Sequence, residues 1–409
     1  MDTSAASPEA DAASFGTICA LGIAQIISWG SMFYAFSFLI TPLMEASGAG
    51  RSVVFGAFSL GLLISGLLSA PVGALIDRVG GRGVMTAGSV AGAALLALLS
   101  QVQSVVALYA VWAGLGFVMA ATLYDPAFAV IMRLFAANYR RAITALTLFG
   151  GFASTVFWPL TQSLIASLGW RDALLVLAAL NLVVCAPIHW WTLPGDGSTV
   201  RSPVPATAAR GGLRAALRTP VFYLLTVAFT GNALVFSATQ VHLMSMLQAK
   251  NLSAASAALV GAMIGPMQVT GRVLELLFAS RLSASTIGIL AMAFLPLSLW
   301  LLGLAGVQWP LLVAFAVVYG TGNGVMTIVR GAIAAELFGR EAYGAINGAL
   351  AAPVIVAKAA GPLAAALLFS WLGGYDATLL VLIAVGGLST AVFVLSTRAR
   401  RRGERAAIQ

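Results

Sequence analysis

The sequence predicts an all-α integral membrane protein with twelve transmembrane helices in two pseudo-symmetric six-helix halves. Three observations support this fold class: the composition, a series of long apolar runs, and an internal repeat. Of the 409 residues, 60% are hydrophobic and only 9% are charged, whereas about a quarter of the residues of a soluble domain are charged. Apolar runs of about 20 residues satisfy their backbone groups in a bilayer only as helices.

The apolar runs divide the chain into twelve predicted spans. The segment before the first of these spans, Met1–Ser14, is polar and acidic and lacks the basic region of a cleaved signal peptide. The first span is therefore expected to remain in the protein. The spans are expected at residues 15–40, 53–76, 84–101, 104–131, 142–168, 172–192, 220–247, 255–280, 284–305, 309–335, 344–370 and 375–397.

A polar segment divides the chain into halves. Thr192–Pro220 is rich in Pro, Gly, Ser and Arg, which is typical of a linker. The predicted parts are a cytoplasmic tail (1–14), a first six-helix half (15–192), a cytoplasmic linker (193–219), a second six-helix half (220–397) and a basic cytoplasmic tail (398–409).

The two halves also resemble each other in sequence. When the fifth and sixth spans are laid on the eleventh and twelfth, Pro159 meets Pro362 and, after one inserted residue, Asp172 meets Asp376. A duplication of this kind predicts parallel halves with a binding site at their interface, near the middle of the bilayer.

The positive charge of the chain follows the predicted topology. The net charge is +9 and the pI is about 10.1. With the amino terminus inside, sixteen of the 22 basic residues fall on the cytoplasmic side and three fall outside. This bias predicts an inner-membrane protein with both termini in the cytoplasm, in contact with anionic lipid and without a nucleic-acid partner. The three remaining cations lie within spans: Arg272, Arg330 and Lys358.

The loop between the second and third spans carries a motif, "GALIDRVGGRGVM" (Gly73–Met85). It resembles the loop signature of the major facilitator superfamily, although Gly81 stands where a basic residue is usual. The positions that match in register are Gly73, Leu75, Asp77, Arg78, Gly80 and Arg82. The resemblance implies the major facilitator fold, a monomer, and transport by alternating access, with Asp77, Arg78 and Arg82 as gating residues. The alternative is a solvated turn whose charges only set topology.

Two cations within the second half point to the substrate. A charge at the centre of a span costs about 3 kcal/mol, so it usually faces a cavity. Arg272 lies in the eighth span and Lys358, one of two lysines in the chain, lies in the eleventh. A bidentate guanidinium and an ammonium suit a carboxylate ligand. The pair resembles the oxalate:formate antiporter and monocarboxylate transporter branch, in which an Arg and a Lys of these spans hold the anion.

The other charges within spans leave alternatives open. Glu275, three residues after Arg272, either neutralises it along one helix face or binds a proton and couples the anion to H⁺. Asp125 and Arg330 either close the inner side as an ion pair across the halves, with Glu336 near Arg133, or pair within their own halves.

Aromatic and amide side chains are candidates for the lining of the cavity, although helix–helix hydrogen bonding is the commoner role for such groups. His189 and His242 lie near span ends, where an interfacial structural role is expected. The predicted substrate-binding residues besides Arg272 and Lys358 are Tyr34, Tyr124, Trp158, Gln268 and Asn323, and the wider set of candidates adds Gln25, Trp29, Asn232, Gln240 and Tyr319.

The predicted function is secondary active transport of a small organic anion, a mono- or dicarboxylate, with proton coupling or exchange left open. The alternative is a drug or metalloid efflux carrier of the same superfamily. An enzyme is not expected, because the spans hold no paired acids and no nucleophile with a base. Cys19 and Cys185 have no ligand-spaced neighbours and no phosphate-binding loop occurs, so no metal or cofactor is expected.

Overall fold

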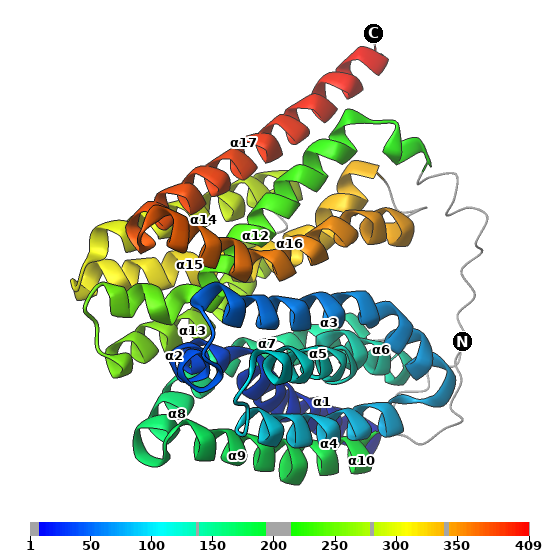
Figure 1. The fold of residues 1–409 in the computed structure, drawn as a ribbon. Helices are drawn as coiled ribbons and strands as arrows, with labels where there is room; N and C mark the ends of the chain where they lie inside the picture. The colour runs from blue at the N-terminus through cyan, green and yellow to red at the C-terminus, as the bar shows by residue number, and fades with distance from the viewer. Residues whose placement is uncertain (1–7, 136–138, 194–213, 279–281, 339–342, 409) are drawn as a thin grey trace. The chain divides into compact units, whose positions relative to one another are not determined.

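The computed structural model describes residues 8–135, 139–193, 214–278, 282–338 and 343–408 (Figure 1). Helices and short turns account for all of these residues, and none of them forms a strand. Twelve helical segments of the described chain are long and apolar enough to cross a membrane. The predicted fold class, an all-α membrane protein with twelve spans, is therefore confirmed. By its internal contacts the chain divides into two compact units.

The first unit comprises residues 1–49 and 64–201. Its core gathers apolar side chains such as Leu21, Ile76 and Leu146. Its elements are α1 (Pro8–Trp29), η1 (Gly30–Tyr34), α2 (Phe36–Ser47), the second part of α3 (Arg51–Val79), α4 (Gly81–Leu99), α5 (Val105–Thr122), α6 (Tyr124–Leu134), α7 (Tyr139–Gly151), α8 (Ala153–Leu168), α9 (Trp170–Leu180), η2 (Asn181–Cys185) and α10 (Ala186–Thr192).

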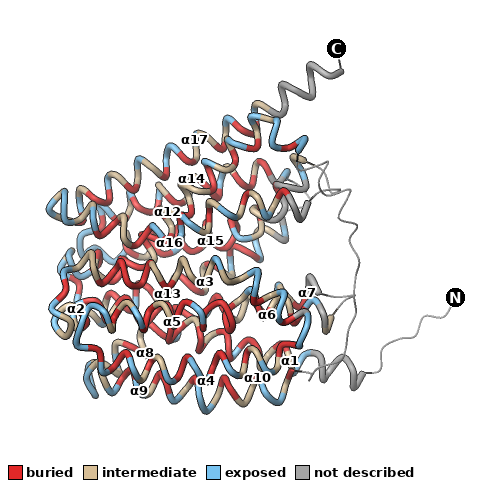
Figure 2. The backbone as a smooth tube through the Cα atoms, turned by 45° about the vertical axis from the view of Figure 1, so that its right-hand side comes forward, coloured by how far each residue is buried: buried red, intermediate tan, exposed pale blue. Residues whose placement is uncertain are grey.

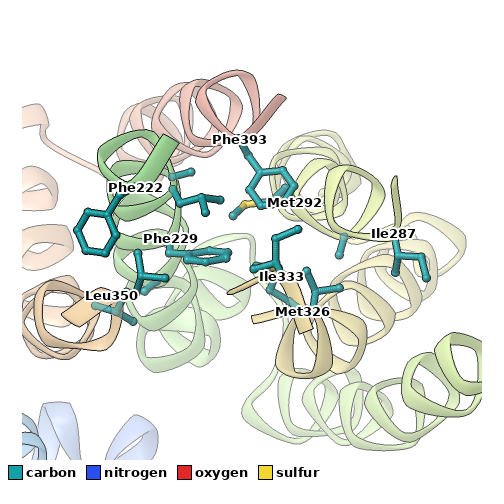
Figure 3. Close-up of a cluster of buried hydrophobic side chains, with 14 of the residues drawn as sticks. Phe222, Phe229, Ile287, Met292, Met326, Ile333, Leu350 and Phe393 are labelled. Carbon is teal, nitrogen blue, oxygen red and sulfur yellow. The ribbon is translucent and has the colours of Figure 1, made fainter. Parts of the chain in front are cut away.

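The second unit comprises residues 50–63 and 202–409, so it takes in the first part of α3. Figure 3 shows its core, in which Phe222 and Phe229 of the first long helix of the unit lie with Met292, Ile333 and Phe393. The helices besides α3 are α12 (Pro220–Ala249), α13 (Ala254–Phe278), α14 (Ala284–Ala305), α15 (Trp309–Phe338), α16 (Tyr343–Leu372) and α17 (Tyr375–Ile408).

Apolar side chains also cover the outward faces of the helices. Figure 2 shows buried and exposed positions alternating along the helices of each unit. Large apolar residues such as Val106, Trp191 and Trp371 are more than three-quarters exposed. Outward apolar side chains suit a protein whose surrounding solvent is hydrocarbon.

Two of the spans in the first unit contain a π-helical turn that the apolar pattern did not predict. These turns, η1 and η2, are joined by a side-chain hydrogen bond in which the Asn181 amide donates to the Ser31 hydroxyl at 2.8 Å. The Ser31 hydroxyl in turn donates to the carbonyl of Ile27 at 2.7 Å. A π turn leaves backbone groups out of the regular helical pattern, and these two polar side chains supply local partners.

The fourth span is broken where a single helix was predicted. Leu123 between α5 and α6 is extended (φ −81°, ψ −153°), and Pro126 has no N–H to donate to the carbonyl of Thr122. The Gln25 amide nitrogen of α1 donates to the carbonyls of Thr122 (2.8 Å) and Leu123 (3.3 Å). Gln25 thus has the helix–helix role in this structure, because it satisfies the carbonyl of Thr122 that Pro126 leaves open, while the carbonyl of Leu123 also accepts from the N–H of Ala127 at 3.4 Å.

The aligned aspartates of the predicted duplication occupy matching places in the two units. Asp172 lies in the first turn of α9 and Asp376 lies in the first turn of α17. Each helix follows a glycine with positive φ, Gly169 at 83° and Gly373 at 78°. An acidic side chain in the first turn is favoured by the helix dipole, and glycine adopts this backbone region at little cost.

Candidate functional site

Close packing between α13 and α15 positions one of the predicted substrate-binding segments. A Cβ at Gly324 would lie 2.1 Å from the carbonyl oxygen of Gln268, and one at Gly271 would lie 2.4 Å from that of Thr321. Small residues at such contacts let two membrane helices approach backbone to backbone. The glycine-rich "GTGNG" segment of α15 therefore brings this helix against the part of α13 that carries Arg272.

The two cations of the predicted anion site are both in the second unit but in different surroundings. Arg272 is buried, with 7% of its surface exposed, as is Gln268 one turn earlier on α13, and Glu275 is half-buried on the same helix. Lys358 is exposed on α16. The backbone there is held by α12, because the Ser237 hydroxyl donates to the carbonyl of Lys358 at 2.6 Å.

A small cavity lies among α12, α14 and α15 of the second unit. Its volume is about 20 Å³, and its polar lining comes from Asn232, Tyr319 and Asn323. The Tyr319 hydroxyl donates to the carbonyl of Phe236 at 3.3 Å, and the two rings stack with their centroids 5.4 Å apart. A cavity of this size holds about one water molecule, so in this conformation it is too small for a carboxylate.

The predicted aromatic residues of the first unit come together as one aromatic cluster, defined by Trp29, Phe33, Tyr34, Tyr124 and Trp158. Neighbouring ring centroids lie 5.2 Å apart for Tyr124 and Trp29, 5.5 Å for Trp29 and Phe33, 5.3 Å for Phe33 and Tyr34, and 5.2 Å for Tyr34 and Trp158. The π turn η1 supplies two of these rings, and Tyr34 meets Trp158 of α8 edge to face at 83°.

The aromatic cluster and its surroundings contain buried polar atoms without a hydrogen bond to any described residue. They are the indole N–H groups of Trp29 and Trp158 and the amide oxygen of Gln25. Burying such a group without a partner costs free energy. These atoms are therefore available to a ligand or to water.

The predicted gating residues of the loop after α3 have separate surroundings. The Arg82 side chain donates from Nε to the carbonyl of Leu193 at 2.7 Å and lies over the ring of Trp190, 5.8 Å from its centroid. Arg82 thus satisfies a carbonyl at the end of α10. Arg78 is exposed, and the side chain of Asp77 lies outside the described part of the structure.

Asp125 and Glu336, the acidic residues of the predicted gate, each accept hydrogen bonds from a serine. Asp125 accepts a hydrogen bond from the Ser69 hydroxyl at 2.5 Å, within the first unit. Glu336 accepts from the backbone N–H of Ser285 at 3.3 Å and from its hydroxyl, at the start of α14. Arg330 is half-buried on α15. The side chain of Arg133 lies outside the described residues.

These features, twelve apolar helices with buried polar side chains inside two helical units, are those of a multi-pass membrane protein. The chain belongs to the major facilitator superfamily, because the model of that family matches residues 21–305. Comparison with curated protein sequences gives no match.

Solved structures of transporters share the fold. A bacterial homologue of the human lysosomal transporter Spinster, in an inward-facing and unoccupied conformation, has a TM-score of 0.74 at 14% identity, covering 97% of this chain and 99% of its own. The nucleoside transporter NupG has a TM-score of 0.73 at 14% identity, covering 95% and 98%. Family and fold together indicate a transporter, rather than an enzyme, that acts on a small-molecule substrate in a membrane.

Proposed function

We propose that this protein is a secondary carrier that moves a small mono- or dicarboxylate by alternating access, as a monomer in the inner membrane with both termini in the cytoplasm. The observation that carries the proposal is the burial of Arg272 within a membrane span. An arginine there is costly unless it has a function or a partner. A carboxylate matches the planar fork of its guanidinium with two parallel hydrogen bonds.

Lys358 supplies the second positive charge of the proposed site. It is exposed near the middle of the span at residues 346–372, where a charged side chain usually faces a cavity and marks the path of a substrate or ion. An ammonium group acts as a point charge without a fixed geometry. Arg272 would then orient the anion and Lys358 would neutralise it, as in the oxalate:formate antiporter and monocarboxylate transporter branch.

Glu275 determines whether transport of the anion is coupled to protons. It is half-buried on the same helix as Arg272, three residues further along. In the proposal, a substrate carboxylate competes with Glu275 for the guanidinium, and Glu275 then takes up a proton. Glu275→Gln should therefore leave anion exchange intact and abolish the pH dependence of net uptake into proteoliposomes.

A thermal-shift titration of the purified protein with formate, oxalate and larger carboxylates tests the anion site. Arg272→Gln should weaken carboxylate binding by about a hundredfold, because a buried charge-assisted pair contributes about 3 kcal/mol. Lys358→Gln should weaken it by about tenfold. Lys250→Gln removes the only other lysine, which pairs with Asp376 at 3.6 Å, and should leave the affinity unchanged. Equal stabilisation of all four proteins would reject the anion site.

The second candidate function is efflux of a drug or another flat organic compound, and the aromatic cluster favours it. Stacking on aromatic rings, with indole N–H groups as donors, suits a neutral planar ligand. A fold neighbour, NupG, is a nucleoside transporter. If neutral aromatic compounds stabilise the parent and Arg272→Gln equally while carboxylates stabilise neither, this second function replaces the first.

A further inference from the structure

The first part of α3 is docked on the second unit through a buried histidine. Phe55 and Phe58 of this segment are fully buried. The ring of Phe55 stacks on His242 of α12 with a centroid distance of 3.8 Å and an interplanar angle of 7°. One turn further along α3, the Ser59 hydroxyl accepts a hydrogen bond from the backbone N–H of Leu363 at 3.2 Å. The imidazole is therefore an integral part of the contact.

The hydrogen bonds of His242 indicate which of its ring nitrogens donates and which accepts. The ring nitrogen Nε2 lies 2.8 Å from the carbonyl oxygen of Pro362, which can only accept, so Nε2 carries a proton. Nδ1 lies 2.9 Å from the Tyr375 hydroxyl. That hydroxyl accepts from Nη1 of Arg51 at 3.1 Å. In the neutral imidazole, with the proton on Nε2, Nδ1 is an acceptor, so the Tyr375 hydroxyl donates its own proton to Nδ1.

The surroundings of His242 include a positive charge and no carboxylate among the described residues. From α3 the ring stacks on Phe55, from α17 it meets the Tyr375 hydroxyl, and from α16 it meets a backbone carbonyl. Arg51, which donates to the same Tyr375 hydroxyl, brings its positive charge to this site. The guanidinium of Arg51 is itself held over the ring of Phe369, 4.8 Å from its centroid.

Three further charged side chains of these helices lie near this contact in the sequence, Lys250, Asp376 and Lys358. Lys250, eight residues after His242 on α12, pairs with Asp376 at 3.6 Å. Lys358, four residues before Pro362 on α16, is exposed. No carboxylate of the described chain forms an ion pair or hydrogen bond with His242.

A proton on Nδ1 would therefore oppose the docked arrangement. It would convert the acceptor into a donor that meets the Tyr375 oxygen, and it would bring a second positive charge near Arg51 in a buried site. In water an imidazolium has neither penalty. His242 therefore binds a proton more tightly in the undocked state than in the docked one. Acid should then shift the first part of α3 toward the undocked state.

We propose that His242 is a proton-binding site whose occupancy controls the docking of Arg51–Leu63 on the second unit, an inference that rests on the proposed carrier function. The helix α3 is continuous, yet its first part belongs to the second unit and its remainder belongs to the first. A movement of one unit relative to the other must bend this helix or release its first part. Proton binding at His242 would favour release.

A distance measurement on the full-length protein tests the proposal without any substrate. Spin labels are placed at Gly50→Cys and Gln248→Cys, two exposed positions, after replacement of the native thiols by Cys19→Ser and Cys185→Ala. Double electron–electron resonance at pH 8 should give one short-distance population. At pH 5 a longer-distance population should rise by about fivefold, as the proton shifts the equilibrium between two states.

Three variants decide the origin of the pH response. His242→Gln should remain docked at both pH values, whereas His189→Gln, which changes the only other histidine, should respond like the parent. Tyr375→Phe keeps the imidazole but removes the donor to Nδ1. The pH at the midpoint of the distance change should therefore rise by about 0.5 to 1 unit in this variant. A parent that does not respond to pH, or a His242→Gln variant that responds like it, overturns the proposal.

The result is independent of the proposed anion site. If His242 controls docking but carboxylates bind neither the parent nor Arg272→Gln, only the substrate assignment fails. If carboxylates bind through Arg272 while the label distances are the same at both pH values, only the proton site fails.

Discussion

The two units of the protein are both helical but differ in the chemistry of their interiors. The first unit brings together aromatic rings around the π turn η1, with indole N–H groups that no described residue accepts. The second unit holds a buried arginine and an exposed lysine within a span. The aligned residues Asp172 and Asp376 thus lie in matching first turns, while the interior of the first unit is rich in aromatic rings and the spans of the second carry the cations.

The way in which helices approach each other also differs between the units, and glycine substitutions would sharpen this contrast. Gly324→Ala should destabilise the second unit by about 3 kcal/mol, because the new Cβ meets the backbone of Gln268, which cannot move aside easily. Gly150→Ala in the first unit meets the Tyr124 hydroxyl, at the end of a side chain, and should cost about 1 to 2 kcal/mol. Thermal denaturation in detergent measures both.

The control for these substitutions is Gly348→Ala on α16. A Cβ at this position meets no atom within 4 Å, and alanine is favoured over glycine in a helix by about 0.5 to 1 kcal/mol. Its melting temperature should be unchanged or slightly higher. If Gly348→Ala lowered the melting temperature as much as Gly324→Ala, the close approach of α13 and α15 would not be the cause of the lost stability.

The predicted gate between Asp125 and Arg330 would connect the chemistry of the two units. Reversing either charge alone should slow exchange of labelled substrate by about tenfold, and reversing both should restore it, because a close charge pair contributes about 1.5 kcal/mol or more. Ser69→Ala removes the observed partner of Asp125 and should leave exchange near the parent rate. If Ser69→Ala slows exchange as much as Asp125→Ala, and the double reversal gives no rescue, Asp125 acts within its own unit.

The break in the fourth span depends on a single amide of the first unit. Gln25→Leu should lower the stability by about 1 to 3 kcal/mol, because it removes the side-chain donor of the Thr122 carbonyl, whereas the carbonyl of Leu123 keeps the N–H of Ala127. The matched control is Gln248→Leu at the exposed end of α12. Comparable melting temperatures for the two variants would argue against a role for Gln25 in supporting the break.

The smallest expected effect distinguishes the two candidate functions. Trp158→Phe removes an indole N–H that has no partner among the described residues and keeps an aromatic ring beside Tyr34. Carboxylate binding should change by less than about threefold, since the anion is held by charge. Neutral aromatic ligands should lose about 1 kcal/mol or more if the indole donates to them. Isothermal titration calorimetry with both ligand classes makes the comparison.

The sequence predicted the fold class and much of the layout because these depend on composition along the chain. Apolar length predicts a membrane helix almost independently of tertiary contacts, and the loop motif at Asp77 and Arg78 identified the family before any fold was known. Tyr34, Tyr124 and Trp158 were selected as aromatic residues within spans, and they share one cluster. Their role in substrate binding, like that of Arg272 and Lys358, stays a prediction.

Other features could not be predicted because they depend on partners distant in sequence. Gln25 resembled a cavity residue in the sequence, but in the structure its amide donates to the carbonyls at the break of the fourth span, a break that Pro126 could have signalled. His189 and His242 were expected to have an interfacial structural role, and the structure adds that both side chains are fully buried. No spacing along the chain relates His242 to Arg51, which lies nearly two hundred residues away.

The sequence by itself determined that this protein crosses a membrane twelve times and belongs to a family of transporters, because hydrophobicity and a short loop motif are local properties. The tertiary structure decided which polar groups meet: a glutamine with the carbonyls of a broken helix, and a histidine with a tyrosine, an arginine and a carbonyl. Inside a bilayer a polar group must find its partner within the protein, and only the fold determines which partner is within reach.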